Sequence, residues 1–140
     1  MGTRSLVAVV IACALAGTGG IASADPKGDI QAKSKEAMEN YDMMDYDAAK
    51  KLHDQAIAAA RKAKLDKDPV VAKVYLRLGI AQFAAGNADA AKAAFVSAVQ
   101  IDDSIEIDAA YRSPVLTKLL DEAKAEAGGG TTNGEPAVDT

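Results

Sequence analysis

The stretch that decides the fold runs from Ala72 to Asp102 and reads AKVYLRLGIAQFAAGNADAAKAAFVSAVQID. Its apolar residues recur every three or four positions, which is the spacing of an amphipathic helix and not of a strand. Gly86 and Asn87 interrupt this pattern. We therefore expect two helices, over residues 69–85 and 88–100, joined by a tight turn in which Asn87 caps the second helix.

Large, small and turn-forming residues stand at fixed offsets along this hairpin: Tyr75, Leu78, Gly79, Phe83, Gly86, Asp89, Ala91, Phe95, Ala98 and Asp102. Together they resemble the tetratricopeptide repeat, a helix–turn–helix unit of about 34 residues. The absence of a side chain at Gly79 would let the second helix approach the first closely. Two positions depart from the repeat, since Asp103 stands where a proline is usual and Gln82 where a tyrosine is usual.

A second, weaker copy of the pattern precedes this one, with helices expected over residues 28–43 and 47–65. It is found by aligning Ala49 and Ala56 with Ala91 and Ala98, so that equivalent alanines lie 42 positions apart. That spacing exceeds one repeat of about 34 residues. The excess falls in residues 59–68, where the second helix is expected to continue.

A fifth helix is expected over residues 114–127, where Ser113 and Pro114 form a helix-start signal like that of Asp68 and Pro69. Its apolar stripe would cover the open end of the hairpins, as a capping element does in repeat arrays. The stripe consists of Val115, Leu116, Leu119, Leu120 and Ala123. Residues 102–112 are expected to form an extended connector with solvated acidic side chains. The predicted fold is all-α, with two tetratricopeptide-like antiparallel helical hairpins, the first degenerate, and a C-terminal capping helix.

The N-terminal 24 residues have the three parts of a secretory signal. A short segment carrying Arg4 precedes the apolar run Leu6–Ala16, and Ala22-Ser23-Ala24 offers a small-residue cleavage site. The predicted organisation is a signal peptide over 1–24, a helical domain over 25–127 and a disordered acidic tail over 128–140. Cleavage after Ala24 would release the protein into the periplasm or the medium.

Two alternatives for this segment stay open. Val10–Cys13 resembles a bacterial lipobox, in which Cys13 would be lipidated and would hold the protein at a membrane. A transmembrane anchor is the other, although the apolar run is shorter than the roughly 20 residues that a spanning helix needs.

The composition argues against several classes of function. Cys13 is the single cysteine, the chain has no tryptophan, and the net charge is −4 without a visible basic patch, which argues against nucleic acid and anionic membrane surfaces as partners. The single histidine, His53, has no serine or cysteine placed to act as its nucleophile. We expect no catalytic residues, no cofactor and no resident metal, and we interpret His53 as a packing residue.

In tetratricopeptide repeats the first helix of each hairpin lines a concave face. By offset along the repeat, the residues of this chain that correspond to the concave face are Ser34, Lys35, Met38, Tyr41, Lys73, Leu76, Arg77, Ile80 and Phe83. Lys73 and Arg77 are four positions apart, so they share a helix face and could hold a carboxylate of a partner. Family members that clamp a C-terminal carboxylate use an asparagine at the offset of Met38 and Ile80, so this clamp is not implied. The alternative is that the last helix or the N-terminal segment covers part of the face.

The resemblance implies a non-catalytic adaptor that binds a segment of another protein on its concave face, outside the cytoplasm. A structural protein that associates with itself is one alternative. The other is a small-ligand or metal carrier, in which soft side chains bind copper: Met38, Met43, Met44 and His53.

Overall fold

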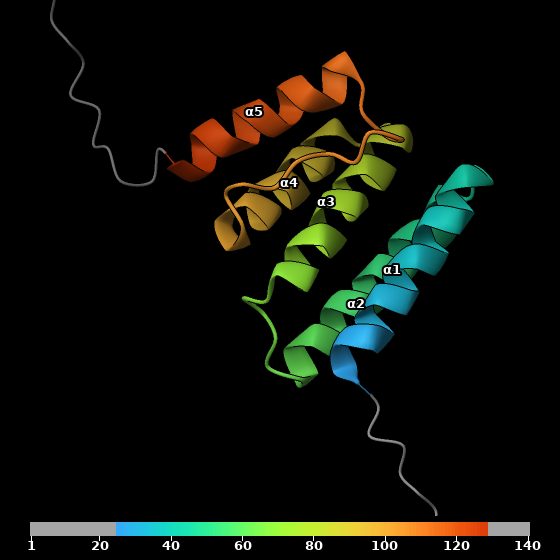
Figure 1. Cartoon of the computed structure of the whole chain (residues 1–140). Coiled ribbons are helices and arrows are strands. Elements are labelled where there is room, and N and C mark those ends of the chain that lie inside the picture. Colours follow the sequence, from blue (N-terminus) through green and yellow to red (C-terminus); the bar gives the residue numbers. More distant parts are fainter. Residues whose placement is uncertain (1–24, 129–140) are drawn as a thin grey trace, which may run out of the picture.

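The structure, a computed structural model, describes residues 25–128 as five helices without a strand (Figure 1). In chain order these are α1 (Pro26–Asp42), α2 (Tyr46–Lys62), α3 (Pro69–Ala84), α4 (Ala88–Ile101) and α5 (Pro114–Gly128). The all-α prediction is confirmed, and every predicted helix is present with ends shifted by three residues or fewer. The predicted signal peptide, with Cys13 and Ala24, and residues 129–140 of the predicted tail lie outside the described residues. None of the helices within residues 25–128 combines the length and the hydropathy that a membrane span needs.

The helices begin where the capping signals predict. Asp68 and Ser113 each accept a hydrogen bond from a backbone N–H in the first turn of the helix that follows, and a proline takes the first helical position. Asn87 differs from the prediction. It precedes α4, but its side chain makes no capping hydrogen bond and instead donates to Gln82 across the turn at 3.3 Å.

Three consecutive helices end in the same way. Met44, Lys64 and Gly86 follow α1, α2 and α3, and all three have positive φ angles of 64°, 57° and 86°. In each case the N–H of the next residue donates to the carbonyl five positions earlier at 2.9 Å, which satisfies a carbonyl at the helix end. The turn at Lys64 ends α2 three residues before the predicted limit, so part of the excess length between the repeats lies in the α2–α3 loop.

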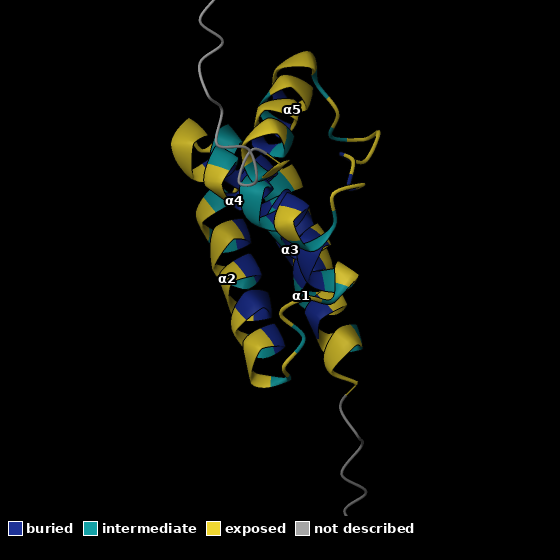
Figure 2. Ribbon diagram, turned by 90° about the vertical axis from the view of Figure 1, so that its left-hand side faces the viewer, coloured by how far each residue is buried: buried dark blue, intermediate teal, exposed yellow. Residues whose placement is uncertain are grey.

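The hairpins α1–α2 and α3–α4 pack side by side, and α5 lies against α4 (Figure 1). The aligned alanines of the two repeats, Ala49, Ala56, Ala91 and Ala98, are all fully buried, which supports their equivalence. Gly79 faces Phe95 on α4, as the close-approach argument predicts. Dark, buried residues follow the inward side of each helix in Figure 2. Val115 is the exception in the predicted stripe of α5, since it is 57% exposed.

The core has two clusters. One joins the two hairpins and contains Ile30, Ile57, Val71, Val74 and Leu78. The other lies under the connector between α4 and α5, and it contains Met38, Leu76, Ile80, Phe95, Ile105, Ile107, Leu116 and Leu120. The connector is therefore not simply solvated, because Ile105 and Ile107 are buried while Glu106 and Asp108 between and after them are exposed. This alternation is that of an extended segment lying on a surface.

Candidate partner-binding groove

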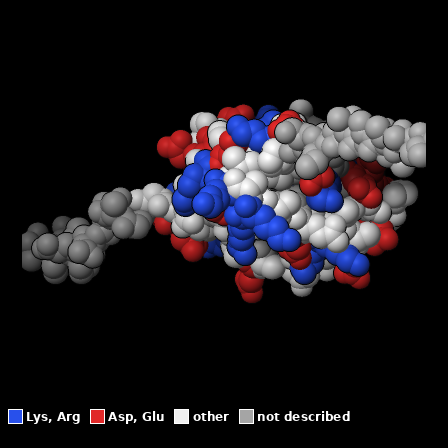
Figure 3. All heavy atoms as spheres, turned by 90° about the horizontal axis from the view of Figure 1, so that it is seen from below, with Lys and Arg blue, Asp and Glu red and all other residues white. Residues whose placement is uncertain are grey.

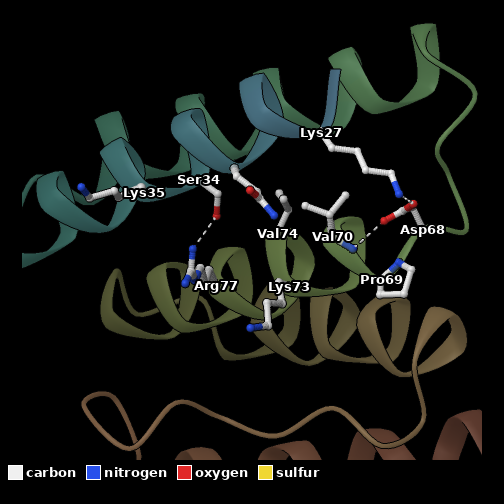
Figure 4. Close-up of a pocket in the computed structure, with 10 residues that line it drawn as sticks. Lys27, Ser34, Lys35, Asp68, Pro69, Val70, Lys73, Val74 and Arg77 are labelled. Carbon is white, nitrogen blue, oxygen red and sulfur yellow. Dashed lines mark hydrogen bonds and ion pairs between the residues drawn. The ribbon is translucent and has the colours of Figure 1, made fainter. Parts of the chain in front are cut away.

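A groove of about 550 Å³ lies between α1 and the beginning of α3 (Figure 4). Its lining comes from α1 and from the start of α3: Lys27, Gln31, Ser34, Lys35, Asp68, Pro69, Val70, Lys73, Val74 and Arg77. These two helices are the first helices of their hairpins, which form the concave side in the predicted architecture. Figure 4 shows Val70 and Val74 pointing from α3 toward α1. The groove thus combines an apolar floor with a rim of cationic side chains.

An ion pair lies at one end of the groove. Lys27 Nζ is 2.6 Å from Asp68 Oδ2, and Asp68 also caps α3 by accepting from the Val70 N–H. The hydrogen bond between the pair raises the pKa of Lys27, and that bond together with the cap lowers the pKa of Asp68. Asp68 is the single carboxylate among the groove residues, and it is already paired. The remaining charge in the groove is therefore positive.

Arg77 lies at the other end and bridges three segments. Its Nη1 donates to the Ser34 hydroxyl of α1 at 3.2 Å, and its Nη2 is 3.6 Å from Asp108 Oδ2 of the connector. The Nε atom is buried and has no hydrogen-bond partner within residues 25–128. Arg77 thus serves the fold as well as the groove, since it holds α1, α3 and the connector together. Lys73 makes no ion pair in the described structure and is exposed.

The predicted concave-face residues divide into two groups. The groove is lined by Ser34, Lys35, Lys73 and Arg77 of the predicted set. Met38, Leu76 and Ile80 lie instead in the core cluster that contains Ile105 and Ile107, so the connector covers them. Tyr41 and Phe83 are half-buried against the same cluster.

The tyrosines at the edge of the connector explain why this part of the face is closed. The Tyr41 ring meets Tyr111 of the connector edge-to-face, with centroids 5.5 Å apart, and lies 5.6 Å from the Tyr46 ring. Burial raises the pKa of both Tyr41 and Tyr111. The sequence suggested the last helix or the N-terminal segment as the cover of this face. The connector was not part of that expectation, yet it covers the part formed by the second half of α3.

Six residues were not predicted from the sequence to line this groove: Lys27, Gln31, Asp68, Pro69, Val70 and Val74. Gln31 and Lys27 lie about one and two helical turns before Lys35, on the same side of α1. A longer continuation of the predicted face toward the helix start would have included them. Val70 and Val74 read as core residues in any amphipathic pattern, so their position at the groove floor follows from the spacing between the hairpins and not from a local signal.

His53 of α2 is fully buried, and neither ring nitrogen has a hydrogen-bond partner within residues 25–128. Burial disfavours the charged imidazolium, and the nearby Arg77 charge adds to this effect, so the pKa of His53 falls to about 4. The ring is neutral at pH 7 and serves as a packing residue.

The soft side chains that a copper site would need are not together. Met38 and His53 lie in the core, whereas Met43 and Met44 are 69% and 77% exposed at the α1–α2 turn. Among residues 25–128, His, Asp and Glu also form no group of three with a metal-binding arrangement.

The sequence profile of the tetratricopeptide repeat matches residues 35–104, which is half of the chain and includes most of both hairpins. The chain belongs to the tetratricopeptide repeat family. Its repeats are of a kind that generally mediates protein–protein interaction and is typically non-catalytic. No curated protein and no solved structure is significantly similar to the chain.

The charges of this repeat domain are unevenly distributed. Figure 3 looks at the end where α1 begins and α2 ends, and it shows Lys and Arg side chains gathered over the middle of this face, with Asp and Glu mostly around its edge. The exposed cations near this end that make no ion pair within the described residues are Arg61, Lys62, Lys64, Lys67 and Lys73, from the end of α2, the loop and the start of α3, and we call them the basic end. The expectation that the chain has no basic patch is therefore wrong, because the net charge of −4 conceals a local excess.

Proposed function

We propose that this domain is a non-catalytic adaptor, working outside the cytoplasm, that binds a segment of another protein in the groove between α1 and α3. The observation that carries the proposal is that this groove stays open while the connector occupies the rest of the concave side. The family's general role in protein binding supports it. The signal-like sequence of residues 1–24 supports the location.

The chemistry of the groove describes the segment that fits. Val70, which is half-buried, offers an apolar contact for one aliphatic or aromatic side chain of the partner, while Val74 is buried at the groove floor. Lys35 and Lys73 stand on opposite helices at the rim, and Lys73 has no ion pair of its own. An extended or helical segment with an apolar anchor and a neighbouring carboxylate would be complementary to this arrangement.

Filling the groove tests the proposal. Gln31 is exposed and lines the groove, so Gln31→Trp places a bulky ring in it without touching the core. Gln55 is an exposed helical glutamine on α2 away from the groove, so Gln55→Trp is the matched control. Proteins cross-linked to each form in the native envelope fraction are compared by mass spectrometry. We expect a partner that wild type and Gln55→Trp retain and Gln31→Trp loses. Equal capture by all three forms would place the interface elsewhere, and cross-links between copies of this chain alone would favour self-association.

A further inference from the structure

The cations without an ion pair are concentrated at one end of the described domain. Seven Lys and Arg residues of the described part make ion pairs with carboxylates. Among those that make none, five form the basic end, all within residues 61–73. The other three are Lys33, Lys51 and Lys124, which lie on three different helices. Carboxylates thus neutralise much of the surface but leave the basic end uncompensated.

The acidic residues near the basic end do not cancel its charge. Residues 61–73 contain two carboxylates, Asp66 and Asp68. Asp68 is held by Lys27 at 2.6 Å, so Asp66 alone remains within this stretch, and Asp25 and Asp29 at the start of α1 add two carboxylates against the five cations. These cations are exposed on long flexible stems, which allows several of them to reach a common surface at once.

The chain enters the domain at this same end. Asp25 caps α1 there, beside the end of α2 and the loop to α3 (Figure 1). The apolar run Leu6–Ala16 precedes Asp25 closely in the sequence. Any membrane attachment of the N-terminal segment would therefore bring the basic end, and not another face of the domain, toward the lipid.

We propose that the basic end docks on an anionic lipid surface. Clusters of several Lys and Arg next to an apolar segment are attracted by acidic headgroups, and each cation contributes separately to the attraction. The basic end acts as a single membrane signal once residues 1–24 are cleaved, so its binding is reversible; a retained N-terminal segment would add a second signal and make the attachment stable. Tyr75 lies beside Arg61 and Lys67, but it is half-buried against the core, so little of its ring is open to a nucleic-acid base; this favours lipid over a single-stranded nucleic acid.

Vesicle sedimentation of the full chain tests the proposal. The probes are vesicles of phosphatidylcholine alone and of phosphatidylcholine with about one third phosphatidylglycerol. The test variant carries Lys62→Glu, Lys64→Glu and Lys67→Glu. The control variant carries Lys33→Glu, Lys51→Glu and Lys124→Glu, which makes the same change in net charge with cations that lie outside the basic end. Circular dichroism melting is used to check that both variants fold.

We expect wild type and the control variant to bind the anionic vesicles, and the test variant to bind them at least about tenfold more weakly. Raising the salt from about 0.15 M to 0.5 M should reduce the binding of wild type as well, because it screens the exposed charges. Equal losses in both variants, or no preference of wild type for anionic vesicles, would overturn the proposal. Tighter binding of a labelled oligothymidylate than of vesicles, lost in the test variant alone, would also overturn it and assign the basic end to nucleic acid.

Discussion

Phe95 lies so close to Gly79 that a Cβ on Gly79 would come within 2.5 Å of Cε1 of the Phe95 ring and 3.0 Å of the Ala91 carbonyl oxygen. Phe95 is fully buried, so its ring has little room to move away. The contact between α3 and α4 is therefore set by the absence of one methyl group. This explains physically why the repeat pattern has a glycine at this position.

Gly79→Ala should destabilise the domain by about 1–3 kcal/mol, because α4 or the Phe95 ring must shift to admit the new methyl group. A chemical denaturation curve gives the change in the free energy of unfolding. Gly128→Ala is the control, since a Cβ at Gly128 meets nothing within 4 Å, and it should change stability by less than about 0.5 kcal/mol. If Gly79→Ala left the denaturation midpoint unchanged, the packing between α3 and α4 could adjust to the new methyl group without cost.

The hydrogen bond between Arg77 and Ser34 should couple α1 to α3 measurably. These residues are 43 positions apart in the sequence, and the bond is partly buried. A double-mutant cycle with Ser34→Ala and Arg77→Ala should give a coupling energy of about 0.5–1.5 kcal/mol. The exposed pair Lys50 and Asp54 on α2 provides the comparison, and its coupling should stay below about 0.5 kcal/mol. Equal coupling in both cycles would mean that Arg77 is not a structural bridge.

His53 should make the domain sensitive to mild acid. Its pKa falls from the ordinary value of 6.5 to about 4 in the folded protein, so the unfolded chain binds the proton more tightly. The resulting stabilisation is complete above pH 6.5 and is lost as the pH falls from 6.5 toward 4. The loss should reach about 3 kcal/mol over this range, since each unit of pKa difference is equivalent to about 1.4 kcal/mol.

His53→Leu removes this titrating group while keeping a bulky apolar side chain. It also removes two buried nitrogens that lack hydrogen bonds, so we expect unfolding at pH 7 to cost about 1 kcal/mol more. Thermal melts between pH 7 and pH 4.5 measure both effects. If the melting temperature of His53→Leu fell with decreasing pH as steeply as that of wild type, the acid sensitivity would belong to other groups.

The left-handed residues that end α1 and α2 are not glycines. Lys64 and Met44 have φ angles of 57° and 64°, whereas Gly86 stands at the equivalent place after α3. A side chain in this conformation costs roughly 1–2 kcal/mol, and glycine relieves it at a smaller cost in chain entropy. Lys64→Gly and Met44→Gly should each raise the melting temperature, with a gain of about 0.5–1 kcal/mol. Gly86→Ala should lower stability by a similar amount. If Lys64→Gly lowered the melting temperature instead, the Lys64 side chain would have to make a stabilising contact.

The parts of the fold that could be predicted are those with local signals. Asp68-Pro69 and Ser113-Pro114 mark helix starts within a few residues, and the Ala, Gly and Phe offsets of one hairpin are enough to predict its packing. The end of α2 was predicted too late because Lys64 adopts a conformation that glycine usually signals.

The position of the connector depends on distant contacts and could not be predicted in this way. Ile105 and Ile107 alternate with acidic residues, which is a local sign of an extended segment with one buried face. What that face covers depends on Leu76 and Met38, which are far away in the chain. The same holds for the groove, whose rim was predicted from one helix face but whose floor depends on the spacing between the two hairpins.

The connector also determines how this array can be lengthened. Because it crosses the second hairpin and is fixed by Ile105, Ile107 and α5, a repeat added after α4 would have to displace it from its own core. The loop between α2 and α3 is the other junction, where Leu65 packs against the cluster that joins the hairpins and Asp68 is paired with Lys27. A hairpin inserted between Lys64 and Asp68 would keep the C-terminal closure, but each of its two faces would have to reproduce the packing that now joins the two hairpins.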